Sequence, residues 1–121
     1  MDAQYLAFFE EFNRQRFFEA HEALEGLWLA DRKGPDAAFY KGLIQLAGAF
    51  VHLQKDRLRP AAALFRLAGA NLQAYPAIHD QLDVAAVRLV VEQWLSRLEA
   101  GSFSANPLRA NAPPTLDLER P

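Results

Sequence analysis

The stretch that decides the fold is residues 39–53, Phe-Tyr-Lys-Gly-Leu-Ile-Gln-Leu-Ala-Gly-Ala-Phe-Val-His-Leu. Its apolar residues recur at spacings of three and four, and they form two adjacent stripes along a helix. A helix that is apolar over so wide an arc is covered on several sides, which predicts a central helix. Gly42 and Gly48 would each cost about 1 kcal/mol relative to alanine in an exposed helix. In a central helix they permit close approach of a neighbour.

The same spacing on the N-terminal side of this stretch predicts two further helices, over roughly residues 3–13 and 17–30. The polar residues 13–16 between them indicate a turn or a kink. Lys33-Gly34-Pro35 ends the second helix, and Asp36 is the expected N-cap of the third. The short connection predicts that the second and third helices pack antiparallel.

On the C-terminal side, Pro60 suits the first turn of a fourth helix, which ends before Pro76. Asp83 is the expected N-cap of a fifth helix, and Gly101 is well placed to end it. No strand alternation of useful length appears anywhere in the chain. The predicted fold class is therefore all-α, a compact bundle of about five helices with an irregular C-terminal tail.

The length of 121 residues suits a single domain with a substantial core. The periodic apolar pattern stops at Gly101, and four of the seven prolines fall in the last twenty residues. We therefore expect a helical domain over residues 1–101 and a proline-containing irregular tail over residues 102–121.

Composition excludes several classes of function. The chain has no cysteine, which rules out disulfides, thiol catalysis and thiolate metal sites. A net charge of −2 argues against a nucleic-acid binder, which normally carries a basic face. No apolar run is long enough to cross a membrane, and no secretory signal is visible at the N-terminus. These features predict a cytoplasmic protein that binds neither nucleic acid nor membrane.

Polar residues interrupt two of the apolar helices and point to a site. His21 and Glu25 lie one turn apart on the second helix, with Glu22 rotated about 100° away from them. The third helix carries a matching polar line in which Gly48 leaves open space. Antiparallel packing could bring the two sets opposite each other. The predicted pocket residues are His21, Glu25, Trp28, Lys41, Gln45 and His52.

Three interpretations of this set remain open. The first is a structural network that fixes the register of the helices, because buried polar groups can specify one packing arrangement. The second is a metal-free pocket for a small ligand or a partner peptide, with His21 as the titratable group, Trp28 as an aromatic wall and Lys41 as an anion contact. Under this second interpretation we expect no cofactor, and no residue stands out as a nucleophile.

The third interpretation is a metal-dependent, hydrolase-like enzyme. His21, Glu25 and His52 would supply two imidazoles and one carboxylate, a set that suits zinc or iron with an open coordination position. Glu22 would then be the candidate general base beside a metal-bound water. A ligand- or partner-binding module is the leading hypothesis and this enzyme is its rival. The unshared apolar arc of the fifth helix also suggests a homodimer through that helix.

Two motifs of this chain resemble those of a known family. Phe12-Asn13 followed by Phe17-Phe18-Glu19-Ala20-His21-Glu22-Ala23-Leu24-Glu25-x-x-Trp28 is similar to the opening motif of the family called domain of unknown function 309, which occurs in bacteria, archaea and plastids. Lys41-Gly42-Leu43-Ile44-Gln45-Leu46-Ala47, with His52, is similar to its second motif. The region from Leu58 to Leu64 is similar to the third, although Arg59-Pro60-Ala61 stands where the family has a Gly-Ala pair after an Asn.

The resemblance covers roughly residues 5–100 and implies a compact multi-helical fold. It brings no agreed activity, substrate or cofactor. The residues that it places at motif positions are His21, Glu22, Glu25, Trp28, Gly42, Gln45 and His52.

Overall fold

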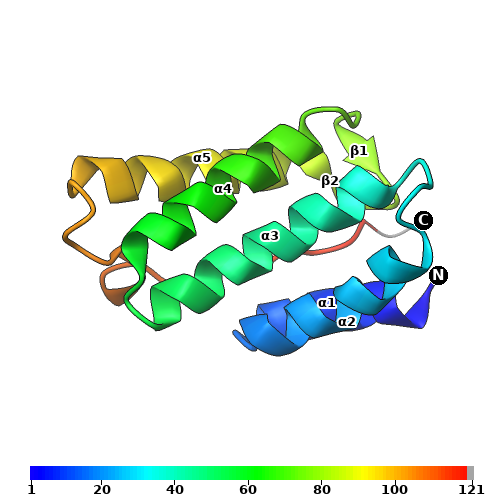
Figure 1. Ribbon diagram of the computed structural model, residues 1–121, viewed down its shortest axis with the longest axis horizontal. Helices are drawn as coiled ribbons and strands as arrows, with labels where there is room; N and C mark the ends of the chain where they lie inside the picture. The colour runs from blue at the N-terminus through cyan, green and yellow to red at the C-terminus, as the bar shows by residue number, and fades with distance from the viewer. Residues whose placement is uncertain (120–121) are drawn as a thin grey trace.

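The computed structural model describes residues 1–119, and five α-helices make up most of it. The helices are α1 (Ala3–Asn13), α2 (Phe17–Ala30), α3 (Ala37–Gln54), α4 (Leu58–Leu72) and α5 (Val84–Ala100). Figure 1 shows α3 in the middle, with α1 and α2 on one side and α4 and α5 on the other. The predicted all-α class is confirmed. Within residues 1–119, no helix combines the length and the hydrophobicity that crossing a bilayer requires.

The central position of α3 depends on its two glycines. A Cβ atom on Gly42 would lie 2.9 Å from Cγ of Leu72 and 3.3 Å from the carbonyl oxygen of Ala68. A Cβ atom on Gly48 would lie 3.1 Å from Cδ1 of Leu64. All three neighbours belong to α4. The glycines therefore allow α4 to approach α3 closely, as the sequence predicted.

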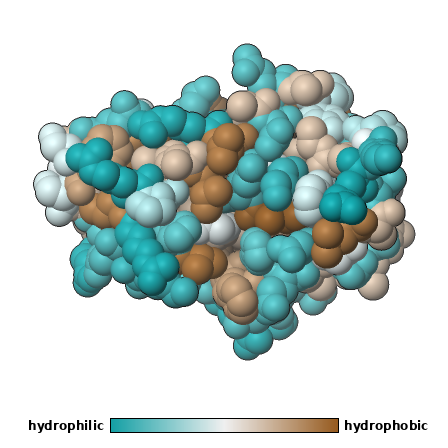
Figure 2. All heavy atoms as spheres, in the orientation of Figure 1, coloured by the Kyte–Doolittle hydropathy of each residue, from teal (hydrophilic) through white to brown (hydrophobic). Residues whose placement is uncertain are grey.

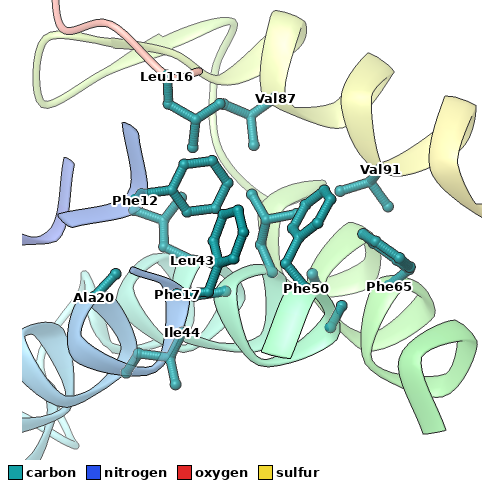
Figure 3. Packing of buried hydrophobic residues seen from close by; sticks show 14 of the residues in the cluster. Phe12, Phe17, Ala20, Leu43, Ile44, Phe50, Phe65, Val87, Val91 and Leu116 are labelled. Atoms are coloured by element: carbon teal, nitrogen blue, oxygen red, sulfur yellow. The ribbon is translucent and has the colours of Figure 1, made fainter. Parts of the chain in front are cut away.

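Phe50 of α3 joins the two halves of the core (Figure 3). Its ring lies 5.0 Å from that of Phe17 in a stacked arrangement and 5.8 Å from that of Phe12 in an edge-to-face one. On the opposite side it meets Phe65 of α4 at 5.3 Å and Trp94 of α5 at 4.9 Å, both edge-to-face. Such geometries add about 0.5–1.5 kcal/mol each beyond the apolar area that they bury. One side chain of α3 thus contacts all four of the other helices.

Asp83 and Gly101 occupy the two caps of α5, as predicted, whereas the prediction for Asp36 was wrong. Asp83 accepts from the backbone N–H of Ala86 and so caps α5, as predicted. Asp36 occupies the N-cap position of α3, but its side chain caps nothing and instead contacts His79 at 2.8 Å. The hydroxyl of Tyr75 takes over the capping role, because it accepts from the N–H of Phe39 at 3.0 Å.

A small hairpin between α4 and α5 was not predicted. Its strands, β1 (Ile78–His79) and β2 (Leu82–Asp83), pair antiparallel, and Asp80 and Gln81 make the turn with positive φ angles of 47° and 61°. Strands of two residues are too short to show an alternating pattern. His79 of this hairpin is half-buried, because the rings of Phe39 and Tyr75 pack against it.

The C-terminal segment runs back along the bundle (Figure 1). It contains one turn of 3-10 helix, η1 (Pro107–Arg109), and is otherwise irregular, as predicted. Leu116 is buried in the core, and Leu118 forms a bridge with Leu82 of the hairpin. The division of the chain into a domain of residues 1–101 and a tail of residues 102–121 stays a prediction. Residues 120 and 121 of that tail lie outside the described part of the chain.

Candidate ligand-binding groove

A groove of about 300 Å³ crosses the middle of α3, between α2 and α4. Helix α3 packs against both neighbours, so it forms the floor while α2 and α4 form the walls. Figure 2, seen from the same side, shows hydrophobic atoms between polar ones near the middle of this face. The lining residues are Phe18, His21, Lys41, Ile44, Gln45, Gly48, Val51, His52 and Leu64.

The floor of the groove is the predicted polar line of α3. Lys41, Gln45, Gly48 and His52 follow one another at steps of four, three and four residues, which keeps them on one face of a helix. All four line the groove. The structure therefore brings together four of the six predicted pocket residues, which are these three polar α3 residues and His21 from α2.

Glu25 and Trp28, the other two predicted pocket residues, lie beside the groove rather than in it. Nε2 of His21 contacts a carboxylate oxygen of Glu25 at 3.1 Å along the surface of α2. The side chains are 31% and 45% exposed, so this pair contributes only a few tenths of a kcal/mol. Glu22 is exposed on the same helix. The carboxylates of α2 thus face solvent more than they face α3.

Trp28 acts on the groove through Lys41. The ammonium nitrogen of Lys41 lies 4.2 Å from the centre of the Trp28 ring, a cation–π contact between α3 and α2. The guanidinium carbon of Arg32 lies 6.0 Å from the same ring. An aromatic face attracts a cation without neutralising its charge. Lys41 is therefore held at one end of the groove while its positive charge remains available.

The two histidines of the groove each bury one ring nitrogen. Nδ1 of His21 and Nδ1 of His52 are shielded from solvent and have no hydrogen-bond partner. Burial lowers the pKa of His52 below its ordinary value of 6.5, and the nearby charges of Arg57 and Lys55 act in the same direction. His52 is therefore neutral at pH 7, and the form with its proton on Nε2 avoids burying an unpaired N–H.

Gln45 is oriented by a residue of α4. The side-chain amide of Asn71 donates to Oε1 of Gln45 at 2.7 Å. Because the carbonyl oxygen of Gln45 is engaged, its NH2 group is the part left for another partner. Asn71 of α4 thus orients one polar side chain in the groove floor.

The structure does not gather the predicted metal ligands His21, Glu25 and His52. Across residues 1–119, no three His, Cys, Asp or Glu side chains are grouped so that they could hold a metal ion. His52 lines the groove but Glu25 does not, so His21, Glu25 and His52 do not converge on one point. These residues do not fit a metal as they stand. The zinc or iron site stays a prediction from the sequence.

The apolar lining of the groove was not predicted. Val51 and Leu64 are half-buried, whereas Ile44 belongs to the buried core with 4% of its surface exposed. The ring of Phe18 stacks on the imidazole of His21 at 6.0 Å, and 52% of Phe18 is exposed. Periodicity reveals an apolar stripe, but it does not reveal which members of the stripe stay uncovered.

The fold and the groove together define a small all-α protein with one mixed polar and apolar hollow over its central helix. Residues 5–64 of the chain match the family described as Domain of unknown function (DUF309), and the chain belongs to that family through this part. The matched residues include both motifs quoted from the sequence, and they contain every lining residue of the groove. The comparisons with curated proteins and with solved structures gave no match.

Proposed function

We propose that this protein is a binding module and that the groove over α3 reversibly holds a small organic molecule. The observation that carries the proposal is the uncovered polar line of α3. Lys41, Gln45 and His52 project from a helix whose other faces are covered, and they do so between two helical walls. Apolar hollows with a few placed polar groups are the usual form of small-molecule sites.

The hydrogen bonds of the groove give little support to a purely structural role. A network that sets the register of α2 on α3 needs hydrogen bonds between those two helices. Among residues 1–119, the polar groove residues make one hydrogen bond between helices, from Asn71 of α4 to Gln45 of α3. The contact of His21 with Glu25 stays within α2. Among the described residues, the cation–π contact of Lys41 with Trp28 joins the polar set to α2, but no hydrogen bond of the set does so, which favours an external partner.

The enzyme hypothesis has no specific observation in its favour. Glu22, its candidate base, is exposed on α2, and the three proposed metal ligands do not converge. Binding without covalent chemistry therefore remains the better account of the groove.

A fragment screen followed by two-dimensional amide NMR tests the proposal. Gly48 lies in the groove floor, so its backbone N–H and the side-chain NH2 of Gln45 report directly on occupancy. We expect hits to shift these signals and to lose affinity in Gly48→Ala, because the added methyl group fills part of the floor. Gly69→Ala is the matched control, since Gly69 is a helical glycine that lies outside the groove.

In Gly69→Ala the added Cβ meets only Cγ1 of Val91, at an ordinary contact distance of 3.4 Å. Hits should bind this variant as they bind the parent protein. The proposal fails if a screen of several hundred fragments shifts no groove signal, or if both glycine variants lower affinity equally.

A further inference from the structure

The groove has a clear charge preference. Its nine lining residues include one lysine and no aspartate or glutamate, although the whole chain has 15 acidic and 13 basic residues. Glu25 contacts Nε2 of His21, which lines the groove, but Glu25 itself lies outside the lining. A ligand in the groove therefore meets one positive charge and no negative charge. Charge complementarity favours an anion.

The polar groups of the floor are also hydrogen-bond donors. Lys41 carries only donors, and the NH2 group of Gln45 has no partner among residues 1–119, whereas its carbonyl oxygen already accepts from Asn71. For neutral His52, the tautomer with its proton on Nε2 leaves no unpaired N–H at the buried Nδ1, so Nε2 is the expected donor. A groove floor with several hydrogen-bond donors selects a ligand that has many acceptors and few donors. A carboxylate, which only accepts, meets that requirement.

The spacing of these donors divides the groove into a head and a body. Lys41 and Gln45 are one helical turn apart, about 6 Å along the axis, which lets both reach one carboxylate. From Gln45 to His52 the floor extends about 10 Å further, over Gly48. Phe18, Ile44, Val51 and Leu64 supply the apolar surface of the groove.

We propose that the groove binds a small organic carboxylate, with its anionic group between Lys41 and Gln45 and its apolar body over Gly48 toward His52. This inference rests on the proposed binding function and specifies the chemical class of the ligand. The cation–π contact with Trp28 holds Lys41 at the head of the groove before any ligand arrives. The cost of ordering this long side chain is then reduced at the moment of binding.

The test compares two probes that differ only in the head group. Octanoate and octan-1-ol have the same chain, and each is titrated into the full-length protein below its aggregation limit while the Gly48 and Gln45 amide signals are followed. One well-placed ion contact corresponds to about a tenfold difference in affinity. We therefore expect octanoate to bind about tenfold more tightly than octan-1-ol.

Lys41→Gln should remove that difference, so that octanoate binds about as weakly as octan-1-ol. Lys33→Gln is the matched control, because Lys33 is exposed in the α2–α3 connection and does not line the groove. It should leave the octanoate preference intact.

Each other outcome overturns a stated part of the proposal. Equal binding of both probes at the groove signals would overturn the carboxylate assignment but leave the groove as a binding site. An octanoate preference that survives Lys41→Gln would overturn the placement of the head group. If neither probe shifts a groove signal, the carboxylate inference fails, and the fragment screen then decides on the binding function separately.

Discussion

The side-chain amide of Asn71 on α4 donates to Oε1 of Gln45 on α3 at 2.7 Å, close to a groove that both helices border. This hydrogen bond decides which end of the Gln45 amide is available, because an engaged carbonyl leaves the NH2 group free. A residue that does not line the groove therefore sets the hydrogen-bonding character of its floor.

Replacing Asn71 should change ligand preference more than stability. In Asn71→Asp the new carboxylate accepts but does not donate, so Gln45 is expected to rotate and direct its carbonyl into the groove. Octanoate affinity should fall several-fold, by about the 0.5–1.5 kcal/mol that a hydrogen bond contributes. Calorimetric titration measures this change. Unaltered octanoate affinity would show that the orientation of Gln45 does not matter to the site.

The two glycines of α3 should respond differently to alanine. Gly42→Ala places a Cβ atom 2.9 Å from Leu72 and 3.3 Å from a backbone carbonyl, and neither can yield without moving α4. Overpacking of this kind costs about 1–3 kcal/mol. Gly48→Ala meets only the end of the Leu64 side chain, at 3.1 Å, and Leu64 borders the groove.

Leu64 can turn into the groove, so the better helix propensity of alanine should leave Gly48→Ala unchanged or more stable by up to about 1 kcal/mol. Urea denaturation of both variants measures the two free energies of unfolding. Equal losses at both positions would contradict the difference in crowding.

The lowered pKa of His52 predicts a dependence of stability on pH. Since its pKa in the folded protein lies below the ordinary value of 6.5, the unfolded chain binds more protons between those two values. The contribution of His52 to the free energy of unfolding is therefore complete above pH 6.5 and declines as the pH falls below it. In His52→Gln, the free energy of unfolding should therefore fall less between pH 7.5 and pH 5.5 than it does in the parent protein. Denaturation curves of both proteins at pH 7.5 and pH 5.5 measure this difference. An equal fall in the free energy of unfolding in both proteins would show that His52 does not cause the pH dependence.

Much of the fold could be predicted from local patterns. The double apolar stripe of residues 39–53 and the signals at Pro60, Asp83 and Gly101 are contained in short windows of sequence, and the structure agrees with them. Asp36 shows where such windows fail. Its carboxylate binds His79, which lies 43 residues further along the chain. A local cap signal does not reveal a distant competitor for the same side chain.

The candidate site was predictable on one helix and not between helices. The periodicity of α3 places Lys41, Gln45 and His52 on one face, and all three line the groove. Glu25 was expected in the same pocket, but it lies beside the groove, because the rotation of α2 about its own axis depends on contacts that its sequence does not specify. The role of Asn71 could not be predicted for the same reason, because its hydrogen bond joins α4 to α3 and depends on how these helices are rotated.

The C-terminal segment should stabilise the bundle through a single asparagine. Nδ2 of Asn13 donates to the carbonyl of Leu116 at 2.9 Å, and Oδ1 of Asn13 accepts from its N–H at 2.7 Å. Asn13→Ala should lower the free energy of unfolding by about 1–3 kcal/mol, and Leu116→Ala by about 2–5 kcal/mol. The double variant should lose less than the sum of both, because Asn13 positions the segment that buries Leu116. Strictly additive losses in chemical denaturation would show that the two contacts are independent.

A second groove, of about 720 Å³, lies between α4 and α5 and favours the homodimer that the apolar arc of α5 predicted. Leu89 stands in its lining with 58% of its surface exposed, while Gly69 and Ala85 leave hollows near it. In a dimer with two-fold symmetry, the projecting Leu89 of each copy could enter the hollow of the other copy.

Arg88 and Glu92 also line this groove one turn apart, and among residues 1–119 neither takes part in an ion pair. Antiparallel α5 helices would set each Arg88 opposite the partner's Glu92.

We propose that a second copy of this chain occupies the α4–α5 groove. Leu89→Glu should then convert a dimer into a monomer, because two buried carboxylates would face a desolvated interface. Leu29→Glu is the matched control, since Leu29 is similarly exposed, at 52%, on α2. Sedimentation equilibrium over a wide concentration range measures both variants and the parent. A parent protein that remains monomeric at the highest concentration removes the proposal, and dissociation by Leu29→Glu instead would move the interface to the other side of the bundle.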